Sequence, residues 1–201
     1  QATLSVTGGN PDGTGNFTAS CNGAVDNAGN SRSVAVGYTV TPPPDSTAPV
    51  ISPNVVGTLG NNGWYVSDVT VSWSVVDNES TPSLSGCEIQ NITSDTAGVT
   101  FTCSATSAGG TASESVTVKR DATAPTISAA ATTQPNVNGW YNGNVTVQFT
   151  CDDNLSGVTS CPTNEILSSE GAAVNSTAQT ITDLAGNNSA ASNVVTVQID
   201  K

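Results

Sequence analysis

The sequence predicts an all-β protein that consists of tandem antiparallel β-sandwich units in an extended array. Motifs recur at a fixed spacing, short segments alternate apolar and polar residues, and no segment shows a helical period. Residues 45–49 read Asp-Ser-Thr-Ala-Pro, and residues 121–125 read Asp-Ala-Thr-Ala-Pro. Asn-Gly-Trp-Tyr occurs at residues 62–65 and again at 138–141, which is the same offset. A fixed period indicates an array of similar units.

The repeat divides the chain into three parts. We expect residues 1–44 to be the C-terminal half of a unit, and residues 45–120 and 121–201 to be one unit each. Thr-Pro-Pro-Pro at residues 41–44 predicts a short stiff spacer before the second unit, whereas the third unit follows the second without a spacer. We therefore expect a restricted, extended arrangement, and both ends read as cut from a longer protein.

Each complete unit contains a strand that has one buried face. β-branched and aromatic residues occupy every second position, which is typical of a half-buried strand. These residues are Val69, Val71, Trp73 and Val75 in the second unit, and Val145, Val147, Phe149 and Cys151 in the third.

A pair of strands is expected to close each unit. In the second unit the alternation of residues 99–105 leads through Ala-Gly-Gly at 108–110 to Val116 and Val118. In the third unit residues 177–182 lead through a turn at 185–187 to a strand over 195–199. Glycine and asparagine in such turns tolerate positive φ. Six or seven short strands per unit indicate a two-sheet sandwich.

The first 44 residues match only the closing half of a unit. Residues 16–21 and 34–40 supply two strands, and Asp-Asn-Ala-Gly-Asn at 26–30 matches Asp-Leu-Ala-Gly-Asn at 183–187. No Gly-Trp-Tyr motif and no Val-Thr-Val strand precede them.

Composition excludes several functions. Sixteen acidic residues face four basic ones, and the net charge is −12. Nucleic acids and anionic membranes need clustered Lys or Arg, so neither is expected as a partner. A membrane-spanning helix needs about 20 consecutive apolar residues, and since no such run exists we expect no membrane insertion. Without histidine the usual general base near neutral pH is absent, and we expect no enzymatic activity.

The five cysteines predict disulfides. Cys87 and Cys103 lie in one unit and Cys151 and Cys161 in another, and such bridges would staple small cores in an oxidising compartment. Zinc is disfavoured because the chain has no histidine and no Cys-x-x-Cys. Cys21 has no partner in its own segment, which leaves three possibilities: a partner outside this sequence, pairing in trans, or a free buried thiol.

These motifs, together with Val-Thr-Val-Gln-Phe-Thr-Cys at 145–151 and Ser-Gly-Val at 156–158, resemble those of bacterial immunoglobulin-like repeats. The resemblance covers residues 45–201, and residues 1–44 as half a unit. It implies a secreted, extracellular or cell-surface protein, since such repeats serve as stalks, spacers, adhesive arms and accessory modules of enzymes. The second unit departs from the pattern, with Thr-Ser-Ala-Gly-Gly at 106–110 in place of Asp-x-Ala-Gly-Asn.

Calcium is the metal that the acidic residues favour, since it takes six to eight oxygen ligands. Some tandem immunoglobulin-like adhesins use calcium to stiffen their junctions, and acidic residues lie near the expected junctions and turns here. The candidate ligands are Asp45, Asp121, Asp152, Asp153 and Asp183. The alternative is that these residues only form turns by hydrogen-bonding their own backbone.

The repeated Trp-Tyr pairs at residues 64–65 and 140–141 allow two interpretations. An aromatic pair directly before a core strand favours packing at the end of the sandwich, and the alternative is a platform for sugar.

The sequence as a whole leads to three candidate functions. The first is a non-catalytic stalk or arm of a bacterial surface protein, secreted protein or adhesin, whose partners are further units of the same chain, neighbouring copies, a glycan or a surface receptor. The second is a filament subunit assembled by strand complementation, and the third is an accessory carbohydrate-binding module of a secreted enzyme.

Overall fold

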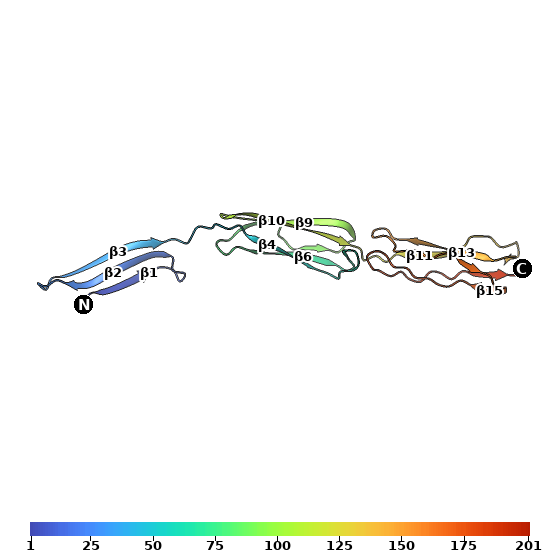
Figure 1. The fold of residues 1–201 in the computed structure, drawn as a ribbon, viewed down its shortest axis with the longest axis horizontal. Coiled ribbons are helices and arrows are strands. Elements are labelled where there is room, and N and C mark those ends of the chain that lie inside the picture. Colours follow the sequence, from blue (N-terminus) through green and yellow to red (C-terminus); the bar gives the residue numbers. More distant parts are fainter.

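The computed structural model describes residues 1–201, which form sixteen β-strands and no helix. Figure 1 shows three groups of strands following one another along a single line, with the two chain termini toward opposite ends. The all-β class predicted from the alternating pattern is confirmed. Since the chain has no helix, it has none that is long and apolar enough to cross a membrane. We refer to residues 1–44, 45–120 and 121–201 as the first, second and third units.

The first unit is one sheet with no second sheet against it. Strands β1 (Thr3–Gly8), β2 (Gly15–Val25) and β3 (Ser31–Val40) are antiparallel in the order β1-β2-β3. The strands over 16–21 and 34–40 were predicted, whereas β1 was not. No residue of this unit is buried.

The second unit has seven strands in two sheets. They are β4 (Val50–Val56), β5 (Trp64–Tyr65), β6 (Val69–Val76), β7 (Ser83–Ser85), β8 (Gln90–Ile92), β9 (Thr96–Ser107) and β10 (Gly110–Arg120). One sheet has the order β4-β6-β8 and the other β5-β10-β9-β7. Val69, Val71 and Ile92 of the first sheet form a buried cluster with Val118 of the second. This arrangement is consistent with a β-sandwich whose core lies between the sheets.

The third unit repeats the arrangement with six strands. They are β11 (Thr126–Ala131), β12 (Trp140–Tyr141), β13 (Val145–Asp152), β14 (Glu165–Leu167), β15 (Gly171–Asn175) and β16 (Thr196–Ile199). The sheets are β11-β13-β14 and β12-β16-β15. Val145, Val147 and Phe149 of β13 pack with Val197 and Ile199 of β16, as the two-residue alternation requires.

Two short strand pairs differ from the expected antiparallel arrangement. Trp64–Tyr65 pairs in parallel with β10, and Trp140–Tyr141 pairs in parallel with β16. In each unit the chain leaves one sheet after its first strand, adds this two-residue strand to the edge of the other sheet, and then returns. A strand that crosses between sheets is not joined to its partner by a tight hairpin, so it is not restricted to antiparallel pairing.

The prediction of a strand over residues 177–182 is wrong. The antiparallel partner of β16 is β15 instead. In the 177–182 segment, serine hydroxyls accept the backbone hydrogen bonds that carbonyls of a neighbouring strand would accept in a β-sheet. The N–H of Ile181 donates to Ser189 Oγ at 2.9 Å, and the N–H of Gln179 donates to Ser192 Oγ at 3.0 Å. These side-chain hydrogen bonds satisfy the backbone N–H groups without a regular strand. Serine side chains commonly compete in this way with the backbone hydrogen bonds of secondary structure.

Both predicted disulfides are present, Cys87–Cys103 in the second unit and Cys151–Cys161 in the third. Cys21 is free and half-buried on β2. Two disulfides are compatible with an oxidising extracellular environment.

The two joints between units differ. The linker over residues 41–44 is exposed, and no hydrogen bond connects residues 1–44 to the rest of the chain. At the second joint, the Asn61 N–H donates to the Ala185 carbonyl at 2.8 Å, and Asn62 Nδ2 donates to the Leu184 carbonyl at 2.8 Å. The loop before β5 is therefore bonded to a turn of the third unit, and the second and third units are fixed end to end.

Candidate metal centre

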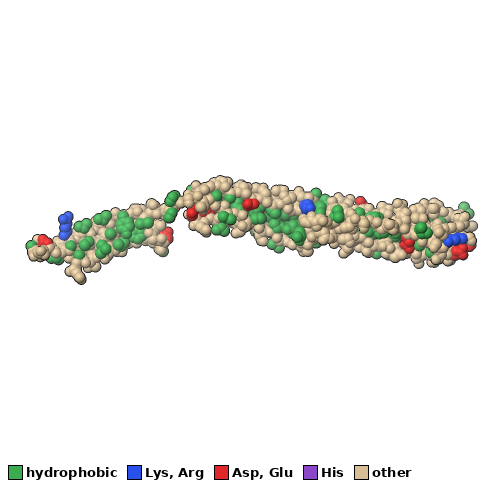
Figure 2. Space-filling view, viewed as in Figure 1, with side chains coloured by type: hydrophobic (Ala, Val, Ile, Leu, Met, Phe, Trp, Pro, Cys, Tyr) green, Lys and Arg blue, Asp and Glu red, His purple; other side chains and the backbone are tan.

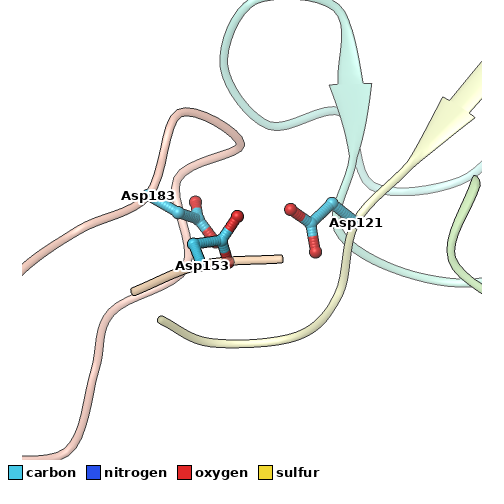
Figure 3. A group of neighbouring side chains, drawn as sticks. All are labelled: Asp121, Asp153 and Asp183. Carbon is cyan, nitrogen blue, oxygen red and sulfur yellow. The ribbon is translucent and has the colours of Figure 1, made fainter. Parts of the chain in front are cut away.

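Three carboxylates converge at the N-terminal end of the third unit, beside the second joint. Asp121, Asp153 and Asp183 each offer an oxygen, and these three oxygens lie within 4.8 Å of one another. Figure 3 shows the side chains of Asp153 and Asp183 next to each other, with the carboxylate of Asp121 turned toward them from the opposite segment. The cluster thus joins residues that lie far apart in the sequence.

Asp121 is the first residue after β10 and has no exposed surface. Its N–H donates to the Tyr65 carbonyl at 2.9 Å, which ties the linker to β5 of the second unit. Its carboxylate accepts hydrogen bonds from the N–H of Thr123 at 3.2 Å and of Ser156 at 3.1 Å. Asp121 therefore contacts the second unit through its backbone and the third unit through its side chain.

Asp153 follows the last residue of β13 and closes a tight loop. Its Oδ1 accepts hydrogen bonds from the N–H of Leu155 at 3.1 Å and of Gly157 at 2.6 Å. Gly157 has φ +83°, a conformation that glycine adopts readily, and this lets the loop turn back on the carboxylate. One carboxylate oxygen fixes the loop, and the other accepts no hydrogen bond.

Asp183 opens the Asp-Leu-Ala-Gly-Asn turn and is also fully buried. Its Oδ1 accepts from the N–H of Gly186 at 2.6 Å and of Asn187 at 2.8 Å, and its Oδ2 accepts from Asn187 Nδ2 at 2.8 Å. Asn187 Nδ2 also donates to the Asp121 carbonyl at 3.0 Å. The turn motif thus brings its own carboxylate to the linker that carries Asp121.

The chemistry of this arrangement suits a hard divalent cation. Like charges held within a few ångströms in a buried site repel one another, and a cation removes that repulsion. A pocket of about 250 Å³ beside the cluster is lined by Asp121 and Asp153, and no Lys or Arg lines it. Each carboxylate keeps one oxygen with acceptor capacity to spare: Asp153 Oδ2 accepts no hydrogen bond, and Asp121 Oδ2 and Asp183 Oδ2 accept one each. Three carboxylates and water would fill a calcium coordination sphere.

Asp95 also lines this pocket and holds the linker in place. Its carboxylate accepts hydrogen bonds from the Ala122 N–H at 3.0 Å and Thr123 Oγ1 at 2.5 Å, and it pairs with Arg120. Burial acts to raise the pKa of Asp95, but the hydrogen bonds from Thr123 and Ala122 and the charge of Arg120 outweigh it, so the pKa lies below its usual value. Asp95 is therefore a charged anchor for the linker.

The second unit carries a smaller version of the cluster at its own N-terminal end. Asp45 and Asp77 occupy the positions of Asp121 and Asp153, one repeat earlier. Asp45 Oδ1 and Asp77 Oδ2 are both buried, and neither has a hydrogen-bond partner. Buried polar atoms in proteins are nearly always paired, so these two oxygens could accept a further ligand such as a cation. The second unit has Thr-Ser-Ala-Gly-Gly at 106–110 in place of Asp-Leu-Ala-Gly-Asn, and the Ser107 side chain lies beside Asp45 and Asp77, so this site has two carboxylates.

Hydrogen bonds keep Asp45 charged. Ser80 Oγ donates to Asp45 Oδ2 at 2.6 Å. This bond is the largest of several polar contacts, with Ser107, Gly109 and Thr47 contributing the others, that lower the pKa of Asp45 to about 2 against an opposing effect of burial. The N–H groups of Glu79 and Ser80 donate to Asp77 Oδ1 at 2.9 and 3.0 Å. These bonds, the one from Glu79 above all, lower the pKa of Asp77, although the nearby Asp45 carboxylate acts to raise it.

The structure brings together three of the five predicted calcium ligands. Asp45 lies at the other end of the second unit, away from these three. Asp152 is the last residue of β13, is exposed, and is not part of the cluster. Successive side chains on a strand point to opposite faces, so of the adjacent pair only Asp153 reaches the cluster. Asp77 was missed, although the repeat period relates it directly to Asp153.

The repeated aromatic pairs are placed differently in the two units. Trp64 is buried and lies under Lys119, whose Nζ is 5.0 Å from the ring centroid. This agrees with the packing interpretation. Trp140 is half-buried and lines a pocket of about 370 Å³ at the far end of the third unit, together with Asn136 and Tyr141.

No protein-family model matches the chain, and no curated protein matches it.

Proposed function

We propose that the chain is a non-catalytic structural module, a stalk or arm of a bacterial surface protein, secreted protein or adhesin, and that its units are immunoglobulin-like. The single observation that carries this proposal is the second joint. There the loop before β5 bonds to the turn over residues 183–187, and Asp121 continues from β10 without a spacer. Units joined end to end extend the chain in one direction, as the function of a stalk requires.

Charge supports the same function. Fourteen of the sixteen acidic residues lie in residues 45–201, against three of the four basic ones. Rods of one charge sign repel one another and remain soluble and separate. No hydrogen bond bridges the first joint, so a change of direction near the N-terminus is expected there and not at the second joint.

Electron microscopy of the purified chain tests this proposal. Strands of 11 and 12 residues set a unit length of about 35–40 Å, so three units in line give rods of about 110 Å. Isolated rods of this length are expected, bent only near one end. Compact particles would contradict the proposal, and a polymer with a regular axial repeat would favour the filament alternative.

We further propose that calcium binds at Asp121, Asp153 and Asp183 and stiffens the second joint. The convergence of these carboxylates supports this proposal. Affinity rises with the number of charged ligands, so we expect the three-carboxylate site of the third unit to bind more tightly than the two-carboxylate site of the second unit.

Melting in calcium and in chelator, compared between two neighbouring variants, tests the calcium proposal. At ten times its dissociation constant calcium would stabilise the third unit by about 1.4 kcal/mol, which raises its melting temperature by about 6–10 °C. Asp153→Asn should abolish this shift, and the adjacent Asp152→Asn should retain it. An equal response of the two variants, or no calcium effect on the unaltered chain, would remove the proposal.

A carbohydrate-binding module is a second candidate because Trp140 lines a partly open pocket with amide and hydroxyl neighbours. Aromatic faces with polar neighbours suit sugar rings. Glycan-array binding that is lost in Trp140→Ala would support it, and an array without signal would exclude it.

A further inference from the structure

The first unit exposes an apolar sheet face that nothing in the chain covers. Residues directly opposite one another across the three strands share a face. The face consists of Leu4, Val6, Gly8, Gly15, Phe17, Ala19, Cys21, Val34, Val36, Tyr38 and Val40. The other face is polar, with rows such as Thr7, Thr18 and Gly37. Figure 2 shows hydrophobic side chains gathered over this unit.

The large side chains on this face are highly exposed. Leu4 is 75 % exposed, Val36 58 % and Val34 50 %. The matching face of the second unit is covered by the opposite sheet. Its Cys103 follows Gly-Val-Thr-Phe-Thr, much as Cys21 follows Asn-Phe-Thr-Ala-Ser. Cys103 packs against Ile51 of the opposite sheet and is 0 % exposed. Every other sheet of the chain already packs against its own partner sheet. Of the sheets formed by these 201 residues, only that of the first unit has no sheet packed against it.

We propose that two copies of this chain pack the apolar faces of their first units against each other, each sheet serving as the second layer of the other's sandwich. A two-fold arrangement places the same patch on both partners, so a uniformly apolar face is complementary to itself. Stacked sheets lie about 10 Å apart with their side chains interdigitated, as in an ordinary β-sandwich.

The area suits a dimer of two copies. The exposed apolar side chains present roughly 500 Å² in each copy, so two copies bury on the order of 1,000 Å², which is at the lower limit for a specific interface. A contiguous exposed apolar patch of about this size is often functional.

The distribution of charge places the contact at this end of the rod. Of the charged residues only Asp12, Asp26 and Arg32 lie in the first unit, so its side chains carry a net charge of −1, compared with −11 for residues 45–201. Two copies that meet through their first units therefore avoid most of the repulsion that separates the remainder of the rods. The exposed linker over residues 41–44 keeps the acidic units apart from the contact.

Cys21 reports on this contact directly. It lies on the central strand of the face, between Leu4 of β1 and Val34 of β3. A thiol must be reached by solvent to react with an alkylating reagent, so a covering sheet slows the reaction. The dimer therefore predicts that Cys21 alkylates slowly at high protein concentration, and about tenfold faster after dilution to the monomer.

The experiment combines mass with thiol reactivity on the 201-residue chain. Sedimentation at about 50–100 μM should give twice the 20.1 kDa chain mass, and iodoacetamide labelling of Cys21 should accelerate on dilution. Val36→Asp, which adds a charge to the apolar face, should yield a monomer with a reactive thiol. Ala35→Asp places the same charge on the opposite face and should remain dimeric.

Three results would overturn the proposal. One is a 20.1 kDa species with a fully reactive Cys21 at every concentration. Another is an equal effect of Val36→Asp and Ala35→Asp. The third is a mass that grows beyond two copies, which would assign the association to the edges of the sheet. The wild-type dilution series decides the question even where a variant misfolds.

Discussion

Removal of one disulfide should destabilise one unit and leave its neighbour unchanged. The Cys87–Cys103 bridge closes 16 residues, and the double substitution Cys87→Ala and Cys103→Ala releases that loop in the unfolded chain. Loop entropy gives about 3 kcal/mol, and truncation of the fully buried Cys103 adds up to about 1 kcal/mol. A unit of this size is stable by only about 4–11 kcal/mol, so its melting temperature should fall by about 15–25 °C.

Differential scanning calorimetry measures this effect, because independent units melt in separate transitions. Only the transition of the second unit should move, and the pair Cys151→Ala and Cys161→Ala should move only that of the third, by a similar amount. A parallel fall of both transitions after either double substitution, or a single transition for residues 45–201, would refute the view that the units fold independently.

Three further predictions concern the ends of the second unit. Because the folded pKa of Asp45 is about 2 against an ordinary 3.8, the stability that its charge provides is complete above about pH 4 and is lost as pH falls toward 2, so Asp45→Asn should flatten the dependence of the melting temperature on pH in that range. Gly109→Ala should destabilise the second unit by about 1–3 kcal/mol in thermal melts, since a Cβ there would lie 2.3 Å from Asp45 Oδ1, whereas Gly143→Ala, with no atom within 4 Å, should have no effect. Asn62→Gly removes the hydrogen bond to the Leu184 carbonyl but fits the φ of +52° there, so each unit should melt normally while NMR relaxation shows the second and third units reorienting more independently.

The strands that the sequence predicted best are those whose pattern is local. Alternation over Val69–Val76 and Val145–Asp152 identifies the central strands and their buried faces, because a period of two places every second side chain in the core. The segment over residues 177–182 is also rich in β-branched residues, three Thr and one Ile, but forms no strand. Its backbone bonds to Ser189 and Ser192, and this competition depends on tertiary contacts that a local pattern does not contain.

The candidate site was predictable in part. The acidic residues at junctions and turns could be identified by residue type. The sequence did not show whether Asp152 or Asp153 faces the cluster, because this depends on where β13 ends. The repeat itself contained the information that Asp77 corresponds to Asp153. The orphaned oxygens of Asp45 and Asp77 depend on packing around them, and no sequence pattern indicates them.

Small-angle X-ray scattering tests the central claim, that the units are arranged in line, most directly. The measurement is best made on the Val36→Asp chain, so that contact between first units does not contribute. Three units in line, about 110 Å long, should give a radius of gyration of about 30 Å. A radius of gyration of about 17 Å, which is expected for a chain of this length folded into one compact globule, would contradict the account.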